Sequence, residues 1–125
     1  MKKCLIDSNI IIRLIVKDPQ DQFLEAKEII RGIEEEKLQG VLSILVVNEI
    51  IWILEHYYDL KRKKFIPILL KLFALKNIKT KEARKDTIIS VLQKMQDKKI
   101  DFTDVYLKEI AKGIQIFSFD RDFKK

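Results

Sequence analysis

The stretch CLIDSNIIIRLIV, residues 4–16, holds the first strand and the first helix that the sequence predicts. Residues 4–6 form a short apolar run that ends at Asp7, which is the pattern of a buried β-strand. The segment from Ser8 to Val16 is apolar on nearly all sides, with Arg13 as the exception, and this predicts a buried helix. A strand followed at once by a helix is the repeating unit of α/β proteins.

The rest of the chain continues this alternation of short strands and longer helices. We expect further strands at residues 41–42, 77–79 and 115–119. We expect further helices at residues 19–37, 44–58, 63–75, 80–95 and 101–112, with Ser43 as an N-cap and Gly113 as a stop signal. This order predicts one α/β domain over residues 1–125, in which helices flank a short, mostly parallel sheet of four to five strands.

Composition excludes several kinds of site. The chain has 125 residues, of which 47% are hydrophobic and 35% charged, as in a folded domain with its own core. One cysteine and one histidine exclude an internal disulfide, a cysteine zinc site and a histidine-pair metal motif. Three glycines leave no glycine-rich phosphate loop, which argues against a P-loop or Rossmann nucleotide site.

Positive charge is concentrated in the middle of the chain. Residues 60–99 hold 13 Lys and Arg against three acids, a balance of +10, so the remaining residues sum to −4 within a net charge of +6. Such a segment either contacts an anionic partner such as a phosphate backbone or forms a solvated helical face. No signal peptide or membrane span is predicted, so we expect a cytoplasmic protein.

Three carboxylates stand in apolar sequence. Asp7 separates two apolar runs, the helical neighbours of Glu49 three and four positions away are all apolar, and Asp120 follows the last predicted strand. Ionised carboxylates are rarely buried unless they are paired or bind a metal ion. An ion pair with a lysine or a hydrogen bond could stabilise any one of these three carboxylates in apolar surroundings, but the presence of all three favours a common site.

Topology favours convergence of these acids with Asp104. Asp7 and Asp120 follow predicted strands, and sites in parallel sheets form outside the carboxyl ends of strands. Asp101 is placed to cap the next helix and Asp104 lies in its first turn, where helix capping and the helix dipole are the simpler explanations. If Asp7, Glu49, Asp104 and Asp120 meet, their repulsion calls for a divalent cation, and an all-oxygen ligand set indicates Mg²⁺ or Mn²⁺. This chemistry is that of a metal-dependent phosphodiesterase.

Four motifs in this order resemble the PIN-domain family, and within it the VapC-type toxins of type II toxin–antitoxin pairs. The motifs are Leu5-Ile6-Asp7-Ser8-Asn9, Asn48-Glu49 in the apolar helix after Ser43, Asp101-Phe102-Thr103-Asp104, and Phe117-Ser118-Phe119-Asp120-Arg121-Asp122-Phe123. The resemblance covers nearly the whole chain.

This resemblance implies a three-layer PIN-like sandwich and a Mg²⁺- or Mn²⁺-dependent endoribonuclease that forms a homodimer and is inhibited by a cognate antitoxin. The catalytic and metal-binding acids that it implies are Asp7, Glu49, Asp104 and Asp120. Supporting positions are Ser8 and Asn9 beside Asp7, Ser118 as a hydroxyl that orients the pocket, and Asp101 and Asp122 as outer acids.

Other functions remain open at this stage. The basic segment alone favours a nucleic-acid-binding module without catalysis, and acids that only cap helices and pair with lysines favour an interaction protein. The same acidic site also suits a nuclease that acts on DNA or in RNA processing. We interpret Trp52 as a core or interface residue and His56 as a surface or structural one.

Overall fold

A computed structural model describes residues 1–119 of the chain. The elements of this range are β1 (Lys2–Leu5), α1 (Ser8–Val16), α2 (Gln20–Glu34), β2 (Leu38–Leu42), α3 (Ile44–His56), α4 (Arg62–Phe73), β3 (Ile78–Thr80), α5 (Lys85–Met95) and α6 (Phe102–Ala111). Six helices and a parallel three-stranded sheet confirm the predicted α/β class and are consistent with a PIN-like fold.

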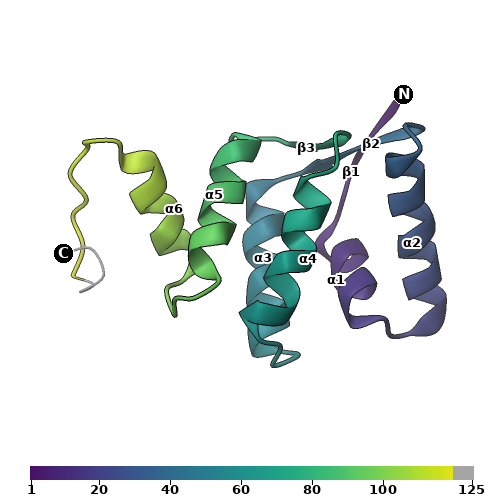
Figure 1. Ribbon diagram of the computed structural model, residues 1–125, viewed down its shortest axis with the longest axis horizontal. Helices are drawn as coiled ribbons and strands as arrows, with labels where there is room; N and C mark the ends of the chain where they lie inside the picture. Colours follow the sequence, from purple (N-terminus) through teal and green to yellow (C-terminus); the bar gives the residue numbers. More distant parts are fainter. Residues whose placement is uncertain (120–125) are drawn as a thin grey trace.

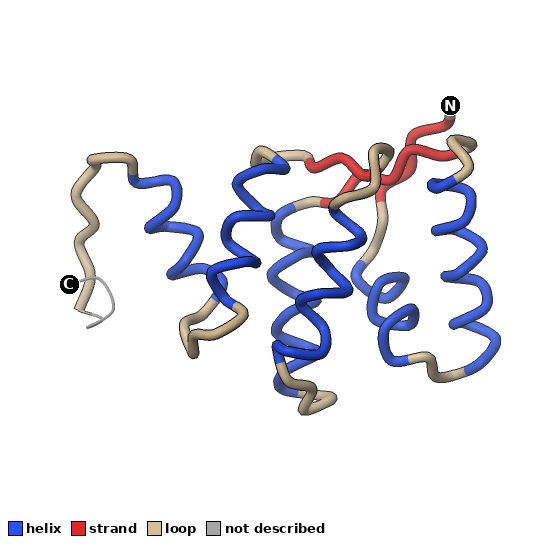
Figure 2. Tube along the Cα trace, in the orientation of Figure 1, coloured by secondary structure: helices blue, strands red, loops and turns tan. Residues whose placement is uncertain are grey.

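The helices stand in a row along the long axis of the molecule, from α2 at one end to α6 at the other (Figure 1). Helix α1 packs between α2 and α3, while α5 packs between α4 and α6. The strands run along one rim of this row (Figure 2). The N-terminus lies beside the sheet, and residues 112–119, which follow α6, lie at the opposite end of the molecule (Figure 1).

The sheet has the strand order β1-β2-β3, and both pairings are parallel. Cys4 lies opposite Gly40, which lies opposite Ile78, so these three positions share one face of the sheet. Parallel neighbours need long crossovers, and helices supply both of them. The carboxyl ends of the strands consequently meet at one edge, where Asp7 and Ser43 follow β1 and β2.

The two faces of the sheet differ in burial. Ile78 and Leu42 are fully buried on the face that Gly40 shares. On the other face Leu5 is 78% exposed and Lys79 is also exposed. Within residues 1–119, helices therefore bury one face of the sheet and leave the other largely open.

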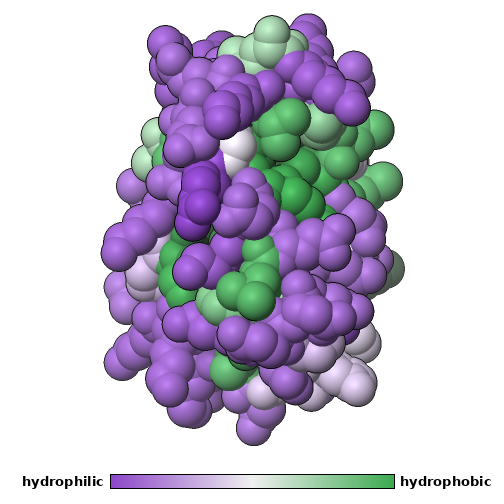
Figure 3. All heavy atoms as spheres, turned by 90° about the vertical axis from the view of Figure 1, so that its right-hand side faces the viewer, coloured by the Kyte–Doolittle hydropathy of each residue, from purple (hydrophilic) through white to green (hydrophobic). Residues whose placement is uncertain are grey.

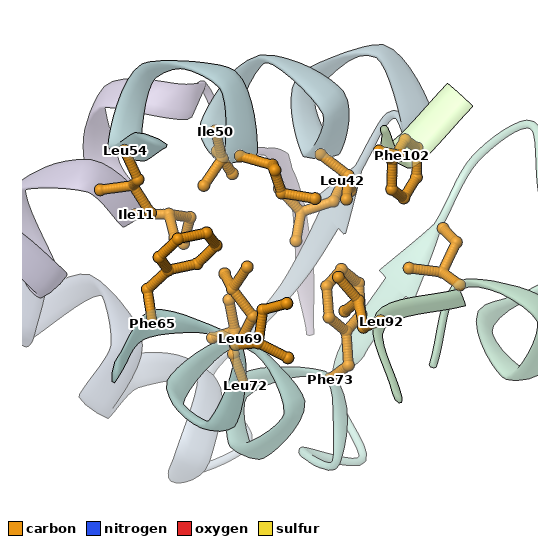
Figure 4. Packing of buried hydrophobic residues seen from close by; sticks show 14 of the residues in the cluster. Ile11, Leu42, Ile50, Leu54, Phe65, Leu69, Leu72, Phe73, Leu92 and Phe102 are labelled. Atoms are coloured by element: carbon orange, nitrogen blue, oxygen red, sulfur yellow. The ribbon is translucent and has the colours of Figure 1, made fainter. Parts of the chain in front are cut away.

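One hydrophobic cluster joins all six helices to the sheet. Figure 4 shows Phe65 and Leu69 of α4 pointing towards Ile50 and Leu54 of α3, with Leu42 of β2 beside them. Aromatic and aliphatic side chains of this size contribute about 1.5–3 kcal/mol each when they are fully buried. The apolar stripes of α3 and α4 thus fix how these helices lie on the sheet.

Local signals explain where several elements begin. The Ser43 hydroxyl accepts a hydrogen bond from the Leu45 N–H at 3.1 Å, so the predicted N-cap of α3 is confirmed. The expected short edge strand is also confirmed as β3. Because Thr80 ends that strand, the helix expected to begin there begins instead at Lys85.

The predicted strand at residues 115–119 is not a strand in the structure, so the sheet has three strands within residues 1–119 rather than four or five. The segment follows α6 at the end of the molecule farthest from the sheet (Figure 1). Its Phe117 is 88% exposed, as expected for a segment with no sheet beside it. Alternating apolar residues make a strand only where a neighbouring strand accepts their backbone hydrogen bonds.

Most of the visible surface is polar. Seen from the end that α2 occupies, hydrophilic residues surround a smaller apolar area (Figure 3). Within residues 1–119, no helix has both the length and the apolar character needed to cross a membrane. Large apolar side chains that are nevertheless exposed include Leu5, Leu45 and Trp52, which stand close in sequence to Asp7 or Glu49.

Candidate metal and nuclease site

The site begins where β1 ends. Asp7 occupies the N-cap position of α1 in an extended conformation, but its side chain makes no capping hydrogen bond. Its carboxylate is exposed, and so is Asn9, whereas Ser8 between them is 3% exposed. The change from strand to helix therefore turns Ser8 into the interior and leaves its two polar neighbours at the surface.

Glu49 on α3 contacts the carboxyl end of β1 through a hydrogen bond with Ser8. The Ser8 hydroxyl donates a hydrogen bond to Glu49 Oε1. These residues are 41 positions apart, so the contact ties the carboxyl end of β1 to the middle of α3. Glu49 therefore contacts the residue that directly follows Asp7 in the chain.

The start of α3 is fixed by a second carboxylate. Glu82 accepts hydrogen bonds at 2.9 Å from the Ile44 N–H and from the Ser43 hydroxyl. The Ile44 N–H, with further help from the Ser43 hydroxyl, lowers the pKa of Glu82. An anionic Glu82 at the N-terminus also suits the helix dipole, so it stabilises the helix that carries Glu49.

Asp101 and Asp104 lie across a hollow from α3. The hollow has a volume of about 290 Å³, and its walls include Asn48 and Trp52 of α3 together with both acids. Asp104 is half-buried in the first turn of α6. Asp101 has the backbone conformation of an N-cap, but its side chain makes no capping hydrogen bond, so its expected capping role is not confirmed.

The apolar sequence around Asp7 and Glu49 predicts that these two acids are buried, and this prediction is wrong. Asp7 and Glu49 are exposed, although their sequence neighbours are apolar. The reason lies in those neighbours, since Leu45 is 75% exposed and Trp52 is 59% exposed. An exposed carboxylate pays no desolvation cost, so burial alone does not require a cation at Asp7 or Glu49.

Not all predicted site residues are brought together. Within residues 1–119, no group of three or more Asp, Glu, His or Cys side chains lies close enough to hold a metal ion. Asp120 and Asp122 lie outside the described residues. Ser118 is described, and it is half-buried in the segment that follows α6.

A family model for the PIN domain matches residues 4–125. The chain belongs to the PIN domain family. PIN domains are usually metal-dependent nucleases and typically use Mg²⁺ or Mn²⁺. Comparison with curated proteins and with solved structures gave no match.

The donor set of this PIN domain fits such a cation in its chemistry. Asp7, Glu49 and Asp104 offer only carboxylate oxygens, which Mg²⁺ and Mn²⁺ prefer as ligands. The surface position of Asp7 and Glu49 suits a site that water and a phosphate must also reach.

Arg62 holds the wall of the PIN domain that carries Asp101. It forms a forked pair with Glu55, with its Nε 2.8 Å from Glu55 Oε2. Its Nη1 donates to the backbone carbonyls of Lys98 at 2.6 Å and Ile100 at 2.8 Å. The loop between α5 and α6 is therefore fastened to α3 and α4. Sequence reasoning did not identify this role of Arg62. The one signal for it is that residue 62 is an arginine among the lysines of residues 61–64, since a guanidinium can donate several hydrogen bonds in a fixed geometry and an ammonium cannot.

Arg13, the single charge of α1, also has a structural place. Its guanidinium donates to the Gln22 side chain and to the Tyr58 hydroxyl, both at 2.8 Å. It therefore connects α1 to α2 and to the turn that follows α3.

Proposed function

We propose that this PIN domain is a Mg²⁺- or Mn²⁺-dependent endoribonuclease that hydrolyses RNA phosphodiester bonds. The observation that carries the proposal is the hydrogen bond from Ser8 to Glu49, since it unites the end of β1 with α3. Asp104 lines a hollow with Asn48 and Trp52 of α3, the helix that carries Glu49, and this supports a place for Asp104 in the same site. The family match supports a nuclease, and the resemblance to VapC-type toxins favours RNA as the substrate.

Asp7, Glu49, Asp104 and Asp120 would hold the cation, with Asp101 and Asp122 as outer acids. When bound, the cation would supply Lewis-acid chemistry, that is, activation of a water molecule and compensation of negative charge on the phosphate. Ser8 orients Glu49 through its hydroxyl, while Asn9 supports Asp7 and Ser118 supports the pocket.

A cleavage assay tests the site directly. Purified protein is incubated with a structured RNA in Mg²⁺ and in EDTA, next to the variants Asp7→Asn, Glu49→Gln and Asp104→Asn. We expect cleavage by the wild type in Mg²⁺ only, and loss of cleavage in each variant. Glu34→Gln, at the exposed end of α2, is the matched control and keeps wild-type activity. Equal cleavage in EDTA and in Mg²⁺ would overturn the proposal.

We further propose that the chain is a VapC-type toxin, a homodimer that a cognate antitoxin inhibits. The motifs around Asp7, Glu49 and Asp104 and the match over residues 4–125 support this assignment. Expression of the wild type should stop bacterial growth, and expression of a short reading frame beside its gene should restore it. Normal growth with active enzyme present would favour a nuclease of RNA processing instead.

The exposed lysines favour one second candidate, a nucleic-acid-binding module without catalysis. Lys61, Lys63, Lys98 and Lys99 are all exposed and line one hollow. That candidate predicts RNA binding that survives Asp104→Asn, needs no metal and is never followed by cleavage.

A single-stranded DNA in the same assay separates a DNA nuclease from a ribonuclease.

A further inference from the structure

Trp52 is a large aromatic side chain that the core does not use. It lies on α3 and is 59% exposed, so the interpretation of Trp52 as a core residue is wrong. The ring of His56, one turn further along α3, lies 5.0 Å from the Trp52 ring, with 38° between the ring planes. The two rings form a joint aromatic surface on the helix that carries Glu49.

This aromatic surface borders the acidic wall of the site. Trp52 and His56 line the same hollow as Asp101 and Asp104. Trp52 stands three positions after Glu49, so both project from neighbouring turns of one helix. A planar group that lies on Trp52 is therefore beside the acids that we propose for phosphodiester hydrolysis.

A larger hollow of about 860 Å³ continues from the first. The two hollows share Glu55, His56 and Asp101 as lining residues, so they lie side by side. The basic residues of the larger hollow are Lys61, Arg62, Lys63, Lys98 and Lys99, and its acids are Glu55, Asp59, Asp97 and Asp101.

The charges of the larger hollow leave lysines available to a ligand. Arg62 and Glu55 neutralise each other in their forked pair. The four exposed lysines then face the acids Asp59 and Asp97, while Asp101 belongs to the acidic wall of the site. Lysines along one path beside an exposed aromatic pair are typical of sites for single-stranded nucleic acid, where the backbone meets cations and bases stack.

We propose that Trp52 and His56 form a base-stacking subsite for single-stranded nucleic acid next to the acidic site. The base of a nucleotide beside the scissile phosphate stacks on the two rings, and the following phosphates run past Lys98 and Lys99 in the larger hollow. The inference rests on the proposed nuclease function for its substrate class. It adds the residues that bind the strand beside the cut.

Trp52 reports on its own occupancy because it is the only tryptophan of the chain. Wild-type protein in EDTA, where no metal-dependent cleavage takes place, is titrated with a short oligouridylate while tryptophan fluorescence is recorded. We expect saturable quenching. An oligonucleotide of the same length without bases should bind more weakly and leave the fluorescence nearly unchanged.

Variants test the contribution of each group by anisotropy of an end-labelled oligouridylate. Trp52→Ala should weaken binding roughly 5- to 150-fold, and Trp52→Phe should restore most of it. His56→Ala should weaken binding less than Trp52→Ala does, and a Lys98→Ala/Lys99→Ala double variant should weaken it in a salt-dependent way. Lys27→Ala/Lys71→Ala removes two exposed lysines of α2 and α4 as the matched control and should bind like the wild type.

The outcomes separate this inference from the proposed function. Equal affinity of Trp52→Ala and wild type overturns the subsite, even if RNA is cleaved. Binding with the expected variant pattern but without any cleavage in Mg²⁺ leaves the subsite standing and overturns the nuclease. A blue shift of Trp52 emission with rising protein concentration and no oligonucleotide would overturn the subsite in favour of a contact between copies of the chain.

Discussion

Ser8 differs from its neighbours Asp7 and Asn9 because its side chain points into the molecule. It is 3% exposed, and its hydroxyl donates to Glu49 Oε1. The Glu49 side chain is exposed and otherwise free to adopt several rotamers. The Ser8 hydroxyl therefore restricts the Glu49 side chain to fewer rotamers.

Ser8→Ala should reduce RNA cleavage about 10- to 100-fold, because residues that orient a metal ligand have effects of this size. The free energy of unfolding should fall by only about 1 kcal/mol, since water can hydrogen-bond to the exposed Glu49. Cleavage rates and urea unfolding measure the two effects. Ser90→Ala is the matched control because the Ser90 hydroxyl donates to Glu109 at 3.1 Å, away from the site. Full activity of Ser8→Ala would show that Glu49 needs no such support.

Gly40 makes room for a close contact between the sheet and α2. A Cβ atom at this position would lie 2.9 Å from Ile33 Cδ1 and 3.1 Å from Ile78 Cδ1. Gly40→Val should therefore lower the free energy of unfolding by about 1–3 kcal/mol through overpacking. Urea unfolding followed by circular dichroism measures the loss, with Val41→Ala on the more open face of β2 as the comparison. An unchanged midpoint for Gly40→Val would mean that α2 moves aside without cost.

At the scale of elements, the loop between α5 and α6 has no helix or strand of its own to hold it. Arg62 replaces that support by binding Glu55 and the carbonyls of Lys98 and Ile100. Its side chain is only 13% exposed and that of Glu55 only 24%. Loss of the arginine would leave a partly buried carboxylate and two carbonyls without their donor.

Arg62→Ala should lower the free energy of unfolding by about 3 kcal/mol, because it breaks a mostly buried pair. Arg62→Lys should recover little of this loss, since an ammonium group cannot reproduce the fork. Chemical unfolding of both variants provides the measurement. The control is Arg31→Ala, whose ion pair with Glu28 is exposed, and it should change stability by less than about 1 kcal/mol. Similar losses in Arg62→Ala and Arg31→Ala would contradict the structural role of Arg62.

Elements with local signals could be predicted from the sequence, and those that depend on distant partners could not. The Ser43 cap and the apolar stripe after it place α3 correctly, because both act within one or two turns. Residues 115–119 have an equally clear alternating pattern, but a strand also needs a partner strand. The sequence pattern contains no information on whether that partner lies beside them.

The same limit applies to the site. The types and order of Asp7, Glu49 and Asp104 identify the family, since motif spacing is a property of the chain alone. The exposure of Asp7 and Glu49 could not be predicted in this way, because it depends on which of their apolar neighbours the fold covers, and Leu5, Leu45 and Trp52 lie at the surface. Apolar neighbours in sequence therefore predicted burial that the fold does not provide.

At the scale of the whole molecule, several carboxylates link stability to pH. Hydrogen bonds from the Ile44 N–H lower the pKa of Glu82, and those from Arg84 lower the pKa of Asp86. The Lys94 ammonium, with the Ser90 hydroxyl, lowers the pKa of Glu109. The bonds to Glu82 and Glu109 join residues 38 and 15 positions apart and therefore depend on the fold, whereas Arg84 and Asp86 are only two positions apart.

Acid should therefore destabilise the protein. A carboxylate whose pKa is lower in the folded state binds fewer protons than in the unfolded state, so unfolding takes up protons as pH falls. The stabilising contribution of Glu82, Asp86 and Glu109 should be complete above about pH 5 and should be lost progressively below about pH 4. Thermal unfolding between these limits measures the slope, and Glu82→Gln should flatten it more than Glu34→Gln, which removes an exposed carboxylate at the end of α2. A melting temperature that rises on acidification would contradict the assigned direction of all three pKa changes.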